Sequence, residues 1–106
     1  MGYVYLIKDP SNQTYKIGVT RVMDGKRLKK LQTGNSNQLQ LLFYYYTIYP
    51  FRLESMLHKK YQSYKVLNEW YDLPPDDVKN FLNICSDIEG LINSLKNNPY
   101  FSKNLK

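Results

Sequence analysis

The sequence contains a single cysteine, Cys85, among 106 residues, so the chain cannot form an internal disulfide. Cys85 lies in an apolar stretch with helical spacing, where packing in the core is the usual role of a free thiol. No cysteine–histidine cluster indicates structural zinc. No apolar run approaches the ~20 residues that span a bilayer, and the N-terminus lacks the apolar segment of a signal peptide. We therefore expect a soluble, intracellular protein that has no membrane partner.

Acidic residues are also scarce, with nine Asp and Glu against 15 Lys and Arg, which gives a formal charge of +6 at pH 7. A basic chain favours a polyanionic partner, because each phosphate that it neutralises releases condensed counterions. Aromatic residues are instead abundant, with 11 tyrosines and four phenylalanines. The length corresponds to one domain with a single modest core.

The first half of the chain is patterned as two strands, a helix and a third strand. Residues 2–8 alternate, so that Tyr3, Tyr5 and Ile7 share one face while Val4 and Leu6 share the other. The turn formers DPSNQT then connect to a second strand, TYKIGVT, and complete a hairpin. A helix is expected from Asp24, its N-cap, to residue 33, and GNSN at 34–37 should stop it. Residues 39–48 are apolar on both alternating faces, which favours a central strand covered on two sides.

The second half is mainly helical. A helix is expected over residues 50–64, with Leu53, Leu57, Tyr61 and Tyr64 as its buried stripe. Residues 66–73 indicate an irregular or short extended segment, and a further helical region follows the two prolines at 74 and 75. Ser86 and Glu89 have the spacing of a capping box, which predicts a break near residue 86.

These elements predict an α/β fold. We expect a small, three-stranded, mostly antiparallel sheet flanked by helices, in the order β-β-α-β-α, with an extra C-terminal helix or helix pair. The expected organisation is a core at residues 1–73, a helical extension packed on it at 74–97, and a basic tail at 98–106.

Five short motifs then resemble a known family. GYVYLI followed by YKIG resembles the paired strands that name the GIY-YIG nuclease superfamily. RLKKLQTGN, ESMLHKKY and NEWYDL resemble its phage- and virus-type branch, which has KIG, LQTGN and ExxLH…EW motifs. The match runs in order from residue 2 to about residue 73. The resemblance implies a GIY-YIG-like fold and a metal-dependent endonuclease that hydrolyses phosphodiester bonds in DNA, duplex or branched.

The resemblance carries over to individual residues. Tyr5 matches the tyrosine of the first motif and Gly18 the glycine of the second, whereas Lys16 stands where the second motif has tyrosine. Arg27 matches the arginine of the helix, and Glu54 matches the glutamate that binds metal. The family's late asparagine is matched only loosely, by Asn68.

The chemistry assigns roles to these side chains. Glu54 would hold Mg²⁺ or Mn²⁺, because Mg²⁺ accepts one carboxylate and keeps much of its water. Arg27 would bind the phosphate, and Tyr5 would orient or deprotonate the attacking water. Lys16 would supply a positive field at Tyr5 or hold the phosphate. His58, four residues after Glu54 on the same helix face, fits a proton shuttle, a partner of Glu54 or a base.

Other interpretations of the same residues stay open. Tyr5 also fits a core aromatic, and Trp70 and Tyr71 fit packing against the sheet. The remaining basic residues near Arg27 fit either a solvated face or contacts to nucleic acid; they are Arg21, Lys26, Lys29 and Lys30.

The function has two rivals to the nuclease. One is a non-catalytic nucleic-acid-binding module that keeps the fold, which the lysine at position 16 favours. The other is a protein-interaction domain whose basic surface meets an acidic partner. The chain has little beyond the nuclease core, so we expect low sequence specificity, cutting directed by DNA structure, or a partner protein that supplies the specificity. The apolar face of the C-terminal helical region fits packing or a homodimer contact. The resemblance to the phage- and virus-type branch implies a location in the cytoplasm, or in the nucleus or viral factory of a host cell.

Overall fold

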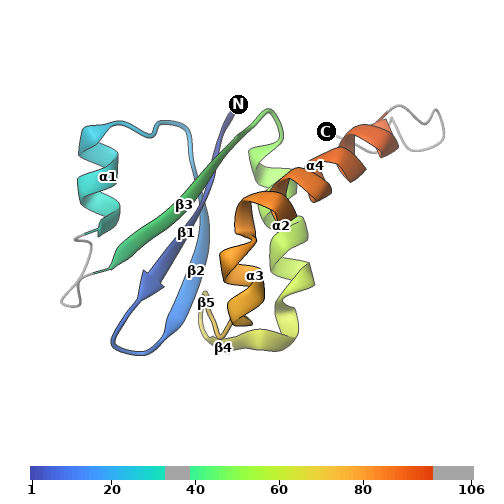
Figure 1. Ribbon diagram of the computed structural model, residues 1–106. Coiled ribbons are helices and arrows are strands. Elements are labelled where there is room, and N and C mark those ends of the chain that lie inside the picture. Colours follow the sequence, from blue (N-terminus) through green and yellow to red (C-terminus); the bar gives the residue numbers. More distant parts are fainter. Residues whose placement is uncertain (33–38, 97–106) are drawn as a thin grey trace.

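Five strands form one antiparallel sheet in the order β3-β1-β2-β5-β4. The computed structural model describes residues 1–32 and 39–96 (Figure 1). The strands are β1 (Gly2–Asp9), β2 (Thr14–Thr20), β3 (Gln40–Thr47), β4 (Lys65–Leu67) and β5 (Trp70–Tyr71). The helices are α1 (Gly25–Gln32), α2 (Pro50–Lys60), α3 (Pro75–Lys79) and α4 (Phe81–Lys96), with a short 3-10 helix, η1 (Gln62–Tyr64).

The predicted fold class is confirmed, since the three long strands are antiparallel and helices flank them. The central position expected for the third strand is wrong, because β3 lies at the edge of the sheet and β1 lies beside it in the interior. The segment at 66–73 supplies most of the two further short strands, β4 and β5, which extend the sheet beyond β2. The helix stop expected at 34–37 and the basic tail expected at 98–106 lie outside the described residues, and the division at residue 73 stays a prediction. None of the helices within residues 1–32 and 39–96 has the length and hydropathy needed to cross a membrane.

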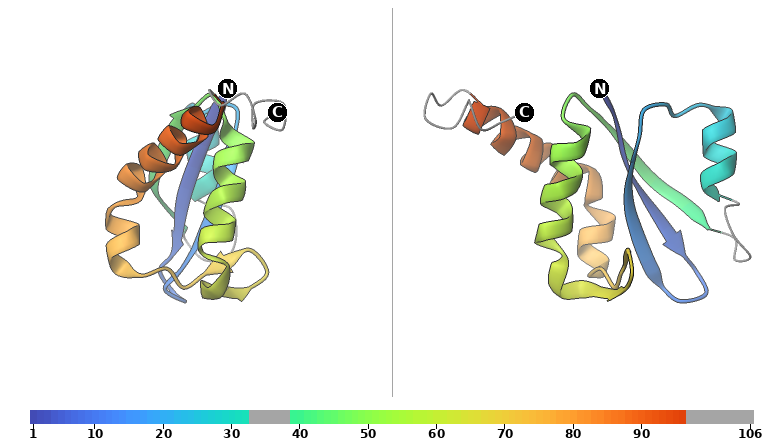
Figure 2. Two further views of the ribbon diagram at one scale, coloured as in Figure 1. Left: turned by 90° about the vertical axis from the view of Figure 1, so that its right-hand side faces the viewer. Right: turned by 180° about the vertical axis from the view of Figure 1, so that it is seen from behind.

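Strand β1 lies between β3 and β2, and its alternating side chains separate two cores. Val4 and Leu6 are fully buried in the larger core, together with residues of α2 and α4. Tyr5 and Ile7 point to the opposite face and pack with Leu39 in a smaller core. Figures 1 and 2 show the same division, with α1 on one side of the sheet and α2, α3 and α4 on the other. The alternation predicted for the first strand is therefore confirmed.

The turn between β1 and β2 is held by the buried side chain of Asp9. Its Oδ1 accepts a hydrogen bond from the backbone N–H of Ser11, and its Oδ2 accepts one from Asn12 Nδ2, both at 3.0 Å. These bonds satisfy a carboxylate that is only 6% exposed. The turn fixes the register of the hairpin, in which Tyr5 stands directly opposite Gly18.

Strand β3 contains an irregularity that decides which of its side chains share a face with Tyr5. Tyr44 pairs with Tyr5, but the register then shifts, so that Leu41 rather than Leu42 pairs with Ile7. The extra residue in β3 has the pattern of a β-bulge. Because directly opposite residues of paired strands share a face, Tyr44 and Leu41 both lie on the Tyr5 side.

Helix α2 starts at the predicted residue and packs through Leu53 and Leu57, which are fully buried. Burial of side chains of this size contributes about 2 kcal/mol each to stability. The helix ends at Lys60, and the expected continuation to Tyr64 is the separate turn η1, so the buried stripe stops at Tyr61. The Tyr61 hydroxyl donates to Asp77 Oδ2 at 2.6 Å and thereby ties the end of α2 to α3.

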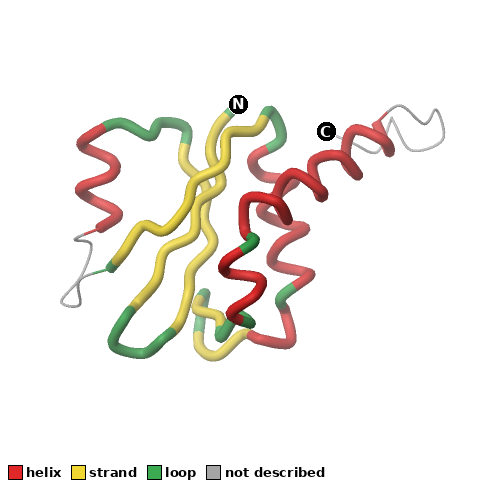
Figure 3. Tube along the Cα trace, in the orientation of Figure 1, coloured by secondary structure: helices red, strands yellow, loops and turns green. Residues whose placement is uncertain are grey.

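The C-terminal region is a helix pair, but its break lies at Asn80 and not near residue 86 (Figure 3). The expected capping box is wrong, because α4 runs continuously past Ser86 and the Glu89 carboxylate is used elsewhere. It accepts hydrogen bonds from the hydroxyls of Tyr45, at 2.8 Å, and Thr47, at 2.5 Å. These bonds attach α4 to β3. Burial, and after it the hydrogen bond to Glu89, raises the pKa of Tyr45.

Cys85 is fully buried in the larger core, as its apolar surroundings predict. Burial, and after it the charge of Glu89, raises the pKa of this thiol to about 12. Since the thiolate is the reactive form, the folded protein should react with a thiol reagent at least about 100-fold more slowly than the urea-unfolded chain at mildly alkaline pH. Absorbance of the released chromophore measures both rates, and equal rates would contradict the buried position.

Candidate active site

Tyr5 and Gly18 fit closely against each other in the sheet. They are paired across β1 and β2, and Tyr5 is only 5% exposed. A Cβ atom added at Gly18 would overlap the Cζ and Oη atoms of Tyr5. The Tyr5 ring thus lies directly over the Gly18 backbone. Tyr5 and Gly18, both matched to the family motifs, are therefore in contact. Position 18 requires glycine because the Tyr5 ring occupies the space that a side chain would need.

We call the sheet face that carries Tyr5 the tyrosine face. Pairing places Lys16 of β2 on this face, opposite Ile7 of β1 and Trp70 of β5. The Lys16 ammonium lies 2.8 Å from Oε1 of Glu69. Glu69 is 60% exposed at its side chain, so the pair is screened by water and stabilises the fold by less than about 1 kcal/mol.

Glu69 is a partner that the sequence did not predict. It occupies the two-residue connection between β4 and β5, next to Asn68, whose φ of 55° is in the left-handed region. Asparagine tolerates this conformation better than most residues, so backbone geometry accounts for Asn68. The dipeptide Asn-Glu between two short extended runs was the available turn signal, but the approach to Lys16 depends on the pairing of β5 with β2.

Arg27 lies in the first turn of α1, where Asp24 caps the helix as expected. The Asp24 carboxylate accepts a hydrogen bond from the backbone N–H of Arg27 at 2.9 Å. The Nε atom of Arg27 is buried, and it has no hydrogen-bond partner in the part of the chain that the structure describes. A buried N–H group without an acceptor costs about 1–3 kcal/mol, so such groups usually have a partner. The chemistry of this guanidinium fits an oxyanion.

The other basic residues proposed for nucleic-acid contact are exposed. Lys26, Lys29 and Lys30 belong to α1. Arg21 follows the end of β2 and lines a hollow that it shares with Arg52, at the start of α2. Their exposure is compatible both with a solvated surface and with contacts to phosphate.

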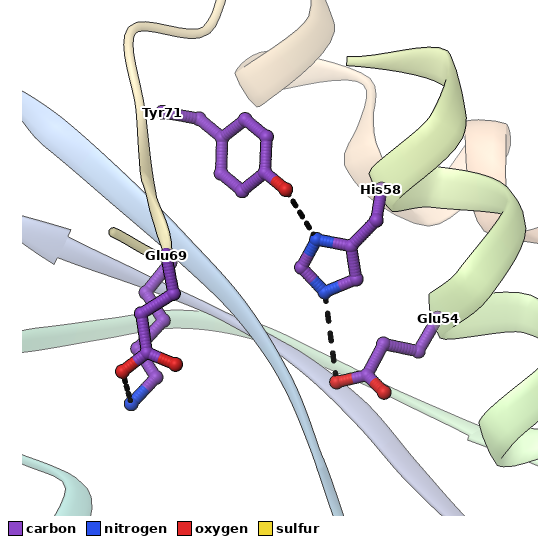
Figure 4. Close-up of polar contacts among 5 residues, drawn as sticks. Glu54, His58, Glu69 and Tyr71 are labelled. Atoms are coloured by element: carbon purple, nitrogen blue, oxygen red, sulfur yellow. Dashed lines mark hydrogen bonds and ion pairs between the residues drawn. The ribbon is translucent and has the colours of Figure 1, made fainter. Parts of the chain in front are cut away.

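Glu54, His58 and Tyr71 form a chain of polar contacts between α2 and β5. Figure 4 shows the His58 ring between the hydroxyl of Tyr71 and the carboxylate of Glu54. His58 Nδ1 lies 2.5 Å from the Tyr71 hydroxyl oxygen, and His58 Nε2 lies 3.7 Å from Glu54 Oε2. Burial, and after it the charge of Glu54, raises the pKa of Tyr71. The phenol therefore stays protonated and donates to Nδ1, which leaves the proton of a neutral His58 on Nε2, facing Glu54.

The predicted site residues thus fall into two groups. Tyr5 and Lys16 lie on the tyrosine face, while Glu54 and His58 project from α2, which packs against the opposite face. Within the described residues, no hydrogen bond or ion pair joins Glu54 or His58 to Tyr5, Lys16 or Arg27. Strand β2 stands between the groups. It pairs with β5 only at Tyr15 and Lys16, so the remainder of its outer edge, up to Thr20, is unpaired.

Sequence reasoning missed Tyr71 as a member of the second group. Packing against the sheet is one interpretation of Trp70 and Tyr71 from the sequence, but both residues belong to the sheet itself. Pairing with Tyr15 turns Tyr71 toward α2, while pairing with Lys16 turns Trp70 to the tyrosine face. The EW dipeptide of the family-like motif was the only signal, and it pointed to the neighbouring residues.

Together, the fold and these contacts define a small α/β domain with an antiparallel sheet and polar groups on both sides of strand β2. The T5orf172 domain matches residues 2–86, and the chain belongs to this family. The T5orf172 domain is phage-associated and is related to homing-endonuclease and GIY-YIG-like folds. Comparisons with curated proteins and with solved structures give no significant match.

Proposed function

We propose that this protein is a GIY-YIG-type endonuclease that hydrolyses phosphodiester bonds in DNA with the help of Mg²⁺ or Mn²⁺. The observation that carries the proposal is the buried Nε of Arg27, which has no acceptor within residues 1–32 and 39–96. A phosphate oxygen would satisfy this group, and a guanidinium is suited to planar recognition of phosphate. The family and the fit of Tyr5 over Gly18 support the same function.

In this proposal the reaction takes place at the edge of β2, between the two groups of side chains. Arg27 binds the phosphate and offsets the charge that develops on its oxygens. Tyr5 orients or deprotonates the attacking water, because its hydroxyl is fixed above Gly18. Lys16 exchanges its exposed partner Glu69 for the phosphate, an exchange that costs little because the ion pair is weak.

The Glu54 carboxylate fits a divalent cation. Its only ion pair among the described residues is the long one to His58, at 3.7 Å, and no side-chain hydrogen bond of these residues involves its carboxylate, so its oxygens keep free acceptor capacity. The described residues contain no group of three or more His, Cys, Asp and Glu side chains arranged to hold a metal ion. Glu54 would therefore be the main protein ligand, with water completing the shell, which suits Mg²⁺. When bound, the metal supplies a Lewis acid for the leaving oxygen.

His58 then acts on Glu54 rather than on the substrate. Its Nε2–H faces the carboxylate, and Tyr71 holds its ring from the other side. Of the three roles open from the sequence, the arrangement favours the partner of Glu54.

One observation favours a second candidate, a non-catalytic nucleic-acid-binding module. The position of the second motif tyrosine carries Lys16, which is already paired with Glu69. Such a module would bind DNA with steep dependence on salt and would not cut it.

Tyr5→Phe distinguishes the two candidates, because it removes one hydroxyl and keeps the ring over Gly18. We expect the wild type to cut single-stranded, duplex or branched DNA only with Mg²⁺ or Mn²⁺, and Tyr5→Phe to cut at least about 100-fold more slowly with unchanged affinity. The measurement is cleavage of labelled DNA on denaturing gels, with Tyr64→Phe as a surface control. Binding without metal-dependent cleavage by the wild type would support the module.

A further inference from the structure

The tyrosine face continues beyond Tyr5 as a cluster of aromatic rings. Tyr3 lies two residues before Tyr5 on β1 and contacts two tyrosines of β3. Its ring centroid is 5.9 Å from that of Tyr44 and 5.3 Å from that of Tyr46, both edge to face. Tyr44 is 49% exposed and Tyr46 is 52% exposed. These three tyrosines are called the tyrosine cluster below.

No helix of the described chain covers the tyrosine cluster. The smaller core under α1 is made of Tyr5, Ile7 and Leu39, with Met23, Leu41 and Trp70 packed against it, and it includes none of the three rings. Two half-exposed tyrosines on β3, both in contact with Tyr3 on the adjacent strand, present contiguous aromatic surface to solvent, which a single surface tyrosine does not. The cluster therefore has the properties of a contact surface.

The cluster borders a basic hollow. Tyr3 pairs with Thr20, and the Tyr46 hydroxyl donates to the sulfur of Met1 at 2.9 Å. Thr20 and Met1 line a hollow of about 250 Å³ together with Arg21 and Arg52. Neither arginine makes an ion pair within the described residues. Arg52 belongs to α2, which packs against the opposite face of the sheet, so the hollow meets the tyrosine cluster around the end of the sheet, at Met1 and Thr20.

We propose that the tyrosine cluster binds an unpaired strand of nucleic acid. Bases stack on Tyr3, Tyr44 and Tyr46, and Arg21 and Arg52 contact the phosphates beside them. Only unpaired bases expose their ring faces for such stacking, whereas a duplex keeps them stacked on each other. The net charge of +6 favours this polyanion and disfavours a second copy of the chain, which would bring further positive charge to the two arginines.

The cluster adjoins the proposed active site, since Tyr44 pairs with Tyr5. A strand on the cluster would therefore lead to the Tyr5 hydroxyl. This selects substrates with a single-stranded segment, such as flaps, forks and single-stranded ends, over intact duplex. The inference names the substrate class of the proposed nuclease and rests on that function only for the cutting, because binding is measurable without it.

The test is the affinity of labelled oligothymidine, measured by fluorescence anisotropy in EDTA, where metal-dependent cutting is excluded. Tyr44→Ala/Tyr46→Ala should weaken binding by about 5- to 100-fold, the range expected for loss of base stacking. Tyr44→Phe/Tyr46→Phe should bind like the wild type, because the rings remain. Tyr64→Ala, which removes a tyrosine 43% exposed on η1, is the matched control and should bind normally. Wild-type affinity of the double alanine variant would overturn the proposal.

A second measurement does not depend on a folded variant. An oligonucleotide that carries iododeoxyuridine should crosslink to the wild-type protein at peptides containing Tyr3, Tyr44 or Tyr46, and crosslinks only elsewhere would overturn the proposal. Analytical sedimentation of the free protein tests whether a second copy of the chain binds the cluster instead. A wild-type dimer that becomes a monomer in Tyr44→Ala/Tyr46→Ala would assign the cluster to that contact and overturn the proposal. If the proposed nuclease function is wrong but the binding proposal is right, the protein will bind oligothymidine in EDTA and will not cleave DNA in Mn²⁺.

Discussion

Replacement of Glu54 by alanine is expected to abolish metal-dependent cleavage, with a loss of about 100-fold or more in rate. The carboxylate is the proposed metal ligand, and its side chain is 27% exposed beside His58. Glu54→Gln keeps the size and can still accept a hydrogen bond from His58, but it lacks the charge that attracts a cation. It should therefore be as inactive as Glu54→Ala. Rates come from cleavage of labelled DNA over a range of Mn²⁺ concentrations.

Glu69→Gln is the matched control for charge. This carboxylate also lies near the site, but it is largely exposed and is bound to Lys16. Its removal should leave the rate close to wild type. A readout independent of activity is the electron paramagnetic resonance signal of free Mn²⁺, which the wild type and Glu69→Gln should reduce and the Glu54 variants should not. Normal cutting by Glu54→Ala would show that the carboxylate is not the metal ligand.

Gly18→Ala is expected to cost about 1–3 kcal/mol of stability and to remove activity as well, because the new methyl group and the Tyr5 ring cannot occupy the same space. Either the ring turns away or the strands separate, and both displace the hydroxyl proposed to act on water. Urea unfolding measures the stability, and DNA cleavage measures the activity.

The control for a glycine-to-alanine change is Gly90, which lies within α4 with no heavy atom within 4 Å of an added Cβ. Gly90→Ala should raise stability by about 0.5–1 kcal/mol, through helix propensity alone. A double-mutant cycle identifies the cause of the loss at Gly18. In a Tyr5→Ala background, Gly18→Ala should cost little, since the ring that it meets is gone. Additive losses would mean that the ring is not the obstacle.

Local patterns predicted the parts of the fold that local interactions decide. Alternation along residues 2–8 predicted both faces of β1, Asp24 caps α1, and Pro50 begins α2, because each depends on side chains close in sequence. The break at Asn80 was missed because Glu89 has the spacing of a capping residue and instead bonds to hydroxyls of β3, more than 40 residues away in sequence.

The candidate site could be predicted only as individual residues. Tyr5 and Gly18 are neighbours because the hairpin register pairs them, and the sequence indicated that hairpin. Glu69 and Tyr71 were not predicted, because β5 has only two residues and its pairing with β2 depends on the whole fold. A strand this short has no periodicity from which its faces can be read.

The hairpin of β4 and β5 contacts both groups of the candidate site. Glu69 binds Lys16 on the tyrosine face, and Tyr71, two residues later, holds His58 on the side of α2. The hairpin is thus a covalent connection between the two sides of the sheet. An anion that competes with Glu69 for Lys16 would release one contact of the hairpin, whose other end holds His58 beside the Glu54 carboxylate. By thermodynamic linkage, any effect of a ligand at Lys16 on the affinity of Glu54 for its ligand is matched by an equal effect of that second ligand on the affinity at Lys16.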